Sequence, residues 1–275
     1  MDIEDLREVE ALLRVAAREE LLSRFEHVEA RTKADGSLVT DADLSMQARL
    51  REELSRRWPE VALLGEEMSR DQQTCLIPEC EDHLWVLDPL DGTSNFASGI
   101  PFFGVSLALL AKGQLQAGIV LDPIRDESFS ALRGRGAWLN GRSLRLHDEG
   151  RSLGQAMAMV DLKRLPPELI LRLAREAPYH SQRSFGSVAL DWCWLAAARV
   201  QVYLHGGQKL WDYAAGSLVL QEAGGVGGLF EDFREHPMEE LGLRPRIAIA
   251  ATHARLFTQW QDWIRATVAD PLPAD

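Results

Sequence analysis

Basic residues are in short supply in this sequence. Its 275 residues include 30 Lys and Arg against 42 Asp and Glu, so the formal net charge is −12. Affinity for nucleic acid comes mostly from Lys and Arg that neutralise phosphates, and anionic membrane surfaces attract the same side chains. The deficit therefore argues against nucleic acid or a membrane as a bound partner.

Cysteine and long apolar runs are also scarce. The three cysteines, Cys75, Cys80 and Cys193, are too few for a disulfide framework and lack the spacing of zinc ligands. No apolar stretch approaches the ~18 to 20 residues of a membrane span. The acidic N-terminal segment lacks the basic start and apolar block of a signal peptide. We therefore expect a cytoplasmic protein.

The remaining composition is that of a globular protein, with 46% hydrophobic residues. Apolar residues recur at helical spacing over residues 4–29 and again over 43–57, where Asp41 or Asp43 could cap the helix. Residues 69–83 hold many polar groups and a proline, which predicts a surface loop.

The pattern changes twice along the rest of the chain. Short apolar runs separated by Gly, Pro or Asp predict an antiparallel sheet in the middle, with Asn140 and Gly141 as a hairpin turn. After residue 152 strands alternate with helices, which is typical of α/β structure. We therefore expect two parts, an α+β half over residues 1–150 and an α/β half over residues 151–275.

The segment WVLDPLDGTSNF at 85–96 carries the clearest chemical pattern. Asp88 and Asp91 follow an apolar strand at a tight turn, which can direct both carboxylates to one point. Two adjacent carboxylates repel each other unless a cation lies between them, and Mg²⁺ prefers such oxygen ligands. The following Gly92, Thr93 and Ser94 offer backbone N–H groups to a phosphate if a helix begins there. The segment thus predicts a metal site beside a phosphate site.

An isolated pattern of this kind is more often structural, with the two acids serving as turn and cap residues. Two further acidic segments change the balance. LLGEE ends a second apolar strand with Glu66 and Glu67, and LWDYAAG places Asp212 at the start of a helix. Each alone would also be read as structural, as a strand-end acid or a helix N-cap.

Together these segments resemble the inositol monophosphatase family of metal-dependent phosphatases. The matching segments, in chain order, are KADGSLVTDAD, LLGEE, WVLDPLDGTSNFASGIPFFGVSLAL, GRGAWLNGRSLRL and LWDYAAGSLVLQEAGG. The resemblance implies a sugar-phosphatase fold of alternating helix and sheet layers (αβαβα). It also implies a homodimeric, Mg²⁺-dependent and lithium-sensitive phosphomonoesterase that hydrolyses a small sugar or polyol phosphate.

The resemblance also implies roles for individual residues, with two or three Mg²⁺ ions in each active site. Glu66, Asp88 and the carbonyl of Leu90 would bind the first ion, and Asp88, Asp91 and Asp212 the second. A third, weaker ion would contact Glu66 mainly through water. Thr93 with Asp43, or Glu66 itself, would help to deprotonate the attacking water. The substrate side would consist of Lys33, Asp91, Gly92, Thr93, Ser94, Ser187, Val188 and His205.

His205 is the point at which this sequence departs from the family pattern. Inositol-specific members have an acidic residue seven positions before the aspartate of the Trp-Asp pair, and this chain has His205 there. A neutral imidazole cannot reproduce the paired acceptors of a carboxylate. A 3′(2′),5′-bisphosphate nucleotidase stays open as an alternative, although that branch more often has Lys-Glu after the threonine. A regulatory or binding protein that keeps the fold is the alternative from another class.

Overall fold

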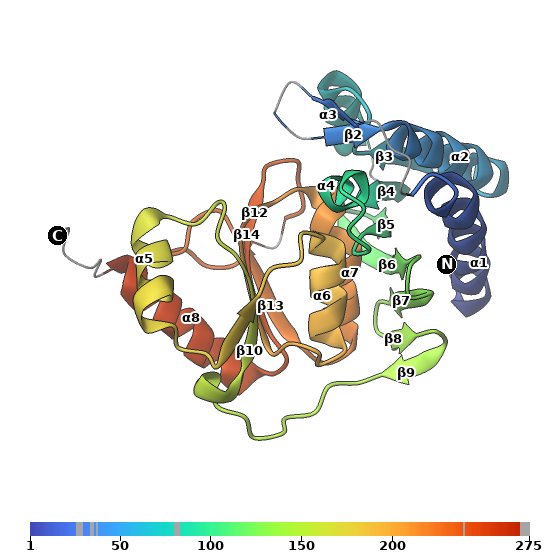
Figure 1. The fold of residues 1–275 in the computed structure, drawn as a ribbon. Coiled ribbons are helices and arrows are strands. Elements are labelled where there is room, and N and C mark those ends of the chain that lie inside the picture. The colour runs from blue at the N-terminus through green and yellow to red at the C-terminus, as the bar shows by residue number, and fades with distance from the viewer. Residues whose placement is uncertain (26–29, 34–35, 37, 80–82, 239, 270–275) are drawn as a thin grey trace.

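Two β-sheets form the framework of the molecule and separate three helical layers (Figure 1). The computed structural model describes residues 1–25, 30–33, 36, 38–79, 83–238 and 240–269. Helices α1 (Ile3–Ala17) and α2 (Asp41–Arg57) pack on one face of the larger sheet, and α6 (Val188–Ala196) and α7 (Leu210–Glu222) lie between the two sheets. Helices α5 (Pro167–Glu176) and α8 (Ala254–Ala269) cover the smaller sheet. The predicted αβαβα layering is confirmed.

The larger sheet is almost entirely antiparallel. Its strands, in spatial order, are β3 (Ala62–Gly65), β4 (His83–Asp91), β5 (Gly104–Ala111), β6 (Gln114–Asp122), β7 (Glu127–Leu132), β8 (Gly136–Leu139) and β9 (Arg142–Leu144). Only β3 pairs in parallel with its neighbour β4. Asn140 and Gly141 have φ values of 49° and 74° between β8 and β9, the left-handed conformation that a two-residue hairpin requires. The predicted hairpin is confirmed.

The smaller sheet is mixed. Its spatial order is β11 (Ser181–Arg183), β10 (Met157–Asp161), β12 (Val202–Gln208), β14 (Arg246–Ala251) and β13 (Val226–Phe230). Strand β10 pairs in parallel with β11 and β12, whereas β14 is antiparallel to β12 and β13. The expected alternation of strands and helices holds here, but the sequence did not predict β11 or the glycine-containing β13.

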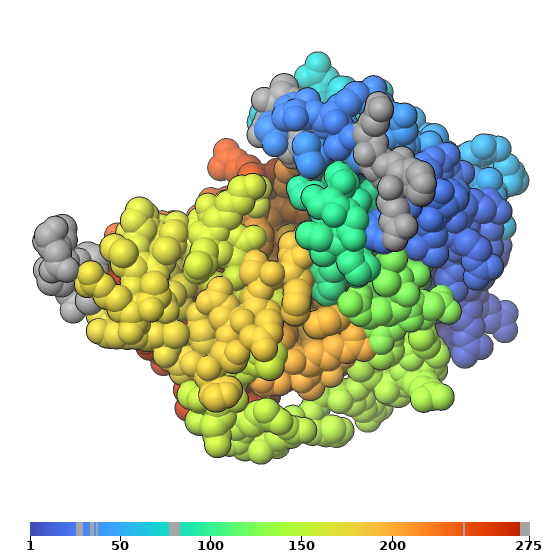
Figure 2. All heavy atoms as spheres, in the orientation of Figure 1, coloured from blue at the N-terminus to red at the C-terminus, as the bar shows by residue number. Residues whose placement is uncertain are grey.

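The two sheets follow one another along the chain. All strands of the larger sheet precede residue 150, and all strands of the smaller sheet follow it. Figure 2 shows the blue-to-green atoms gathered on one side of the molecule and the yellow-to-red atoms on the other. The division into domains at residue 150 stays a prediction. Three apolar cores fill the spaces between the layers, and the central one surrounds α6 and α7.

Three sequence-based expectations about helices were wrong. The opening helix ends at Ala17 and continues as a π-helical turn over Arg18–Leu22, and residues 26–29 lie outside the described part of the chain. Thr40 caps α2, while Asp43 accepts the N–H of Thr40 in return. This reciprocal pair is a capping box.

The third concerns residues 69–83, where a loop was expected. Helix α3 (Arg70–Glu79) forms there. Ser69 accepts the N–H of Gln72, and Gln72 accepts the N–H of Ser69. This Ser-x-x-Gln capping pattern begins a helix whose polar face is exposed. Among the described helices, none is long and apolar enough to cross a membrane.

Candidate active site

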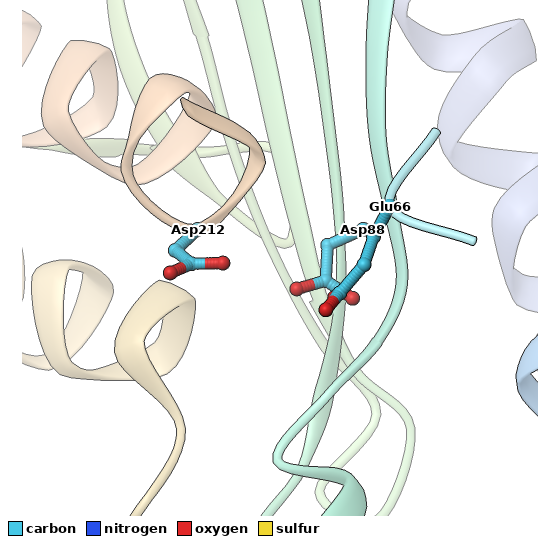
Figure 3. Close-up of side chains that lie close together, drawn as sticks. All are labelled: Glu66, Asp88 and Asp212. Atoms are coloured by element: carbon cyan, nitrogen blue, oxygen red, sulfur yellow. The ribbon is translucent and has the colours of Figure 1, made fainter. Parts of the chain in front are cut away.

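Three acidic side chains from separate segments converge where the two halves meet. Glu66 follows β3, Asp88 lies in the neighbouring parallel strand β4, and Asp212 lies in the first turn of α7. One carboxylate oxygen from each lies within 4.8 Å of the others. Figure 3 shows the carboxylates of Glu66 and Asp88 beside each other, with Asp212 facing them from the start of its helix.

The backbone explains why these acids can meet. Strands β3 and β4 run parallel, so their carboxyl ends lie at the same edge of the sheet. The register of β4 with β5 shifts between Asp88 and Asp91, where Pro89 has no N–H to donate to the neighbouring strand. The N–H of Leu90 donates to the Asp88 carboxylate at 3.0 Å and holds this turn.

The site accumulates negative charge in a buried position. Asp88 is 1% exposed. Burial, followed by the charges of Glu66, Asp91 and Asp212, raises the pKa of Asp88 well above its usual range. Burial and the charges of Glu66 and Asp91 do the same to Asp212. Such a cluster cannot be fully ionised without a compensating cation.

Two ammonium groups already lie against the cluster. The Nζ atoms of Lys33 and Lys209 each lie 3.4 Å from Glu66 Oε1, and Lys33 Nζ lies 2.6 Å from Glu67 Oε1. Burial opposes the charged form of Lys33, but the charges of Glu66 and Glu67 raise its pKa overall. The cluster therefore attracts positive charge.

The donor set suits a hard divalent cation. Its members are carboxylate oxygens, and the carbonyl of Leu90 lies on the same turn, where it accepts the Thr93 hydroxyl at 3.0 Å. Mg²⁺ prefers oxygen ligands of this kind. The residues present therefore fit the metal that the sequence pattern implied.

Asp91 is oriented differently from the three converging acids. Its Oδ2 atom accepts the Ser187 hydroxyl at 2.5 Å and the N–H of Ala189 at 2.8 Å. Burial raises the pKa of Asp91 to about 6, although these hydrogen bonds oppose the shift. Ser187 is fully buried and precedes Val188, the first residue of α6. Asp91 therefore caps a helix of the opposite half while its charge acts on Asp88 and Asp212.

Thr93 and Asp43 form a hydroxyl–carboxylate pair beside the acids. Thr93 Oγ1 lies 3.1 Å from Asp43 Oδ1. Asp43 is 1% exposed, and its other oxygen accepts the N–H and hydroxyl of Thr40. Burial raises the pKa of Asp43. The pair is thus held in a fixed geometry by α2.

The turn before Thr93 brings the two halves into backbone contact. Gly92 has φ 92°, and a Cβ there would lie 3.2 Å from the Phe102 carbonyl and 3.3 Å from that of Gly186. Helix α4 (Thr93–Ala97) begins directly after it, with Ser94 exposed in its first turn. A side chain at Gly92 would therefore push this turn away from the loop before α6.

Asn95, which was not predicted as a site residue, joins these segments. The amide of Asn95 donates to the carbonyls of Phe102 and Phe185 at 2.7 and 2.6 Å. Asn95 thereby links the turn at Gly92 to the loop before α6. Its place in the TSNF segment was the available signal.

The structure places His205 within β12, and it does not belong to the group of three converging acids. The ring is 3% exposed, and its Nδ1 atom accepts the N–H of Gly207 at 3.1 Å. Burial lowers the pKa of His205 to about 4. The ring is therefore neutral at physiological pH and covered by protein.

Fold and site together define an alternating-layer α/β protein with three converging acidic side chains that could hold a cation. The family model described as "Inositol monophosphatase family" matches residues 2–262. The chain belongs to the inositol monophosphatase family.

Similar proteins agree with this assignment. The protein named "Nus factor SuhB" from Pseudomonas aeruginosa is 37% identical over 218 residues, which cover 77% of this chain and 78% of that protein. The solved structure of a Thermotoga maritima IMPase has a TM-score of 0.80 at 25% identity and covers 97% of this chain and 99% of its own. The extragenic suppressor protein SuhB from Bartonella henselae has a TM-score of 0.77 at 29% identity, with 93% and 94% covered.

Proposed function

We propose that this protein is a Mg²⁺-dependent phosphomonoesterase that hydrolyses a small sugar or polyol phosphate similar to inositol 1-phosphate. The observation that carries the proposal is the convergence of Glu66, Asp88 and Asp212 within 4.8 Å. Membership of the inositol monophosphatase family supports the reaction class. We further propose that the enzyme works as a homodimer in the cytoplasm.

The acids are assigned to two or three Mg²⁺ ions. Glu66, Asp88 and the Leu90 carbonyl would hold one ion, and Asp88, Asp91 and Asp212 a second. Divalent ions in such a site acidify water and neutralise charge on phosphoryl oxygens. The raised pKa of Asp88 and Asp212 supports the assignment, because these acids need cations to remain ionised.

The chain itself would position the substrate and move the proton. The Thr93 hydroxyl, 3.1 Å from Asp43, can pass a proton to that carboxylate. Backbone N–H groups of Gly92, Thr93 and Ser94 would hold the phosphate, with Lys33 adding positive charge. The remaining work is orientation, which accounts for much of the rate in phosphoryl transfer.

The test is phosphate release from a panel of metabolites with and without Mg²⁺, using the wild type and Asp88→Asn. Mutation of a residue that only hydrogen-bonds to a metal ligand lowers metal affinity or activity by ~10- to 100-fold. We therefore expect loss of the ligand Asp88 itself to reduce turnover by at least about 100-fold. Asp41→Asn is the matched control, because Asp41 is exposed and pairs with Arg31. Lithium should inhibit the wild type. Substantial Mg²⁺-dependent activity in Asp88→Asn would contradict the proposal.

Two alternatives give different results in the same assay. A bisphosphate nucleotidase would hydrolyse adenosine 3′,5′-bisphosphate much faster than inositol 1-phosphate. The name Nus factor, carried by the SuhB relatives, favours a regulatory protein that retains the fold. If no metabolite in the panel released phosphate in a Mg²⁺-dependent way, the result would support the hypothesis of a regulatory protein.

A further inference from the structure

A second carboxylate lies beside the residue that departs from the family pattern. Asp161 is the last residue of β10 and pairs with His205 of the parallel strand β12. The carboxyl ends of parallel strands lie at the same edge of a sheet, where open α/β sheets bind ligands. From this edge β12 leads into α7 and Asp212 (Figure 1). Asp161 and His205 therefore share the edge that faces the acid cluster.

The hydrogen bonding of His205 defines its tautomer. Because Nδ1 accepts the N–H of Gly207, the neutral ring carries its proton on Nε2. Nε2 lies 3.8 Å from Asp161 Oδ2. The covered ring therefore directs an N–H toward the carboxylate of the neighbouring strand.

Asp161 is the accessible member of this pair. Its side chain is 27% exposed, compared with 3% for His205. Oδ1 accepts the N–H of Lys163 at 2.7 Å, and Oδ2 faces the imidazole. A carboxylate has about four acceptor positions, so it can accept further hydrogen bonds from a ligand.

The charge of Asp161 acts on the first turn of α6, the helix that Asp91 caps. Asp191 is buried in the first turn of α6. Burial, then the charges of Asp91 and Asp161, raise its pKa well above the usual range. Both carboxylates therefore act on the start of the same helix, and one of them is a proposed metal ligand.

Packing holds the two strand ends together. A Cβ at Gly206 would collide with the backbone carbonyl of Arg164. The Arg164 guanidinium donates to the Gly207 carbonyl at 3.1 Å. The loop after Asp161 thus packs on the irregular end of β12, which holds the Asp161 side chain in a fixed position for binding a ligand.

We propose that Asp161 determines substrate specificity by accepting hydrogen bonds from hydroxyls of a polyol or sugar phosphate, with His205 as a positioning residue. The inference rests on the proposed phosphatase function. In inositol-specific members of the family the acceptor carboxylate would lie in β12, at the position of His205. In this protein it would lie in the neighbouring strand β10, at Asp161. A purely structural Asp161 would only close the turn to Lys163, and asparagine can make that same bond.

The test is Asp161→Asn, assayed in Mg²⁺ with inositol 1-phosphate and with p-nitrophenyl phosphate, which has no alcohol hydroxyls. Loss of a hydrogen bond to a charged group weakens binding by about 10- to 100-fold. We therefore expect the ratio of the two kcat/KM values to shift by that factor in favour of p-nitrophenyl phosphate. The change should fall mainly on the KM for inositol 1-phosphate. His205→Ala should shift the ratio in the same direction by a smaller factor.

The matched control is Asp232→Asn. Asp232 is exposed after β13 and accepts the N–H of Arg234, the same local bond that Asp161 makes to Lys163. This control should leave both activities unchanged. An unchanged ratio in Asp161→Asn, or equal losses on both substrates, would overturn the inference and leave the phosphatase function standing. A wild type that hydrolyses neither substrate would overturn the proposed function and the inference with it.

Discussion

The two halves of the molecule contribute to the site in different ways. The larger sheet supplies Glu66, Asp88 and Asp91 from the ends of adjacent strands and one tight turn. The smaller sheet and its helices supply Asp212 and Asp161 from segments far apart in the sequence. The larger sheet thus supplies most of the proposed cation ligands from neighbouring strands, whereas the proposed recognition of the substrate hydroxyls depends on the second half alone.

Besides the bonds from the Ala189 N–H to Asp91 and from Lys209 to Glu66, serine and asparagine side chains of the described residues donate three hydrogen bonds between the halves near the site. Ser187 donates to Asp91, Ser106 to the Trp211 carbonyl at 2.8 Å, and Asn95 to the Phe185 carbonyl. The donors of two bonds come from the first half and the donor of the third from the second. The acid cluster is therefore complete only when the halves are docked.

Among the variants that compare the two halves, the largest effect should come from removal of the Thr93 hydroxyl, which belongs to the first half alone. We expect Thr93→Val to lower kcat by about 100-fold, as for other lost proton-transfer groups, with little change in KM. Thr93→Ser keeps the hydroxyl next to Asp43 and should retain most of the activity. Steady-state kinetics measures both variants. Similar kcat values for valine and serine at this position would show that the pair with Asp43 is not used.

A smaller effect should distinguish a hydrogen bond to the Asp91 carboxylate from a hydrogen bond to a neutral carbonyl, both of which join the halves. Ser187→Ala removes a donor to the buried Asp91 carboxylate, so we expect a loss of about 1.5 to 3 kcal/mol in the free energy of unfolding. The Mg²⁺ concentration for half-maximal activity should also rise by about 10-fold. Urea unfolding and metal titration measure these quantities.

Ser106→Ala is the control for that variant. Ser106 is equally buried but donates to a neutral carbonyl, so about 1 kcal/mol should be lost without a change in Mg²⁺ requirement. If both serine variants raised the Mg²⁺ requirement equally, weaker packing between the halves would explain the effect. The hydrogen bond from Ser187 to Asp91 would then have no specific role in Mg²⁺ binding.

The smallest effect should be a dependence of stability on pH without divalent cations. Burial raises the pKa of Glu67 to about 7 and that of Asp91 to about 6. The folded state then binds protons that the unfolded chain has already released, so stability falls as pH rises from about 4.5 to 7. Added Mg²⁺ should raise the Tm by a few degrees more at pH 8 than at pH 5, because its ligands must be deprotonated. An equal rise at both pH values would contradict this account.

Local patterns predicted much of the fold and of the metal side. The hairpin at Asn140–Gly141 and the strand before Asp88 depend on hydrophobic period and turn residues, which are visible in the sequence, whereas the αβαβα layering followed from the family resemblance. Helix α3 was not predicted because its polar composition and Pro78 are typical of a loop, although Ser69 and Gln72 form a capping pair at its start. The link made by Asn95 was missed because its partner Phe185 lies 90 positions away.

The sequence by itself determined the family and the acids available for a cation site, because both depend on residue types at short spacings within motifs. The layer order followed from the family resemblance. Only the tertiary structure decided that Glu66, Asp88 and Asp212 meet within 4.8 Å while Asp91 caps α6. It also decided that Asp161 lies beside His205. The physical reason is that strand register and helix docking are set by packing between distant segments, and spacing along the chain does not encode which strand ends become neighbours.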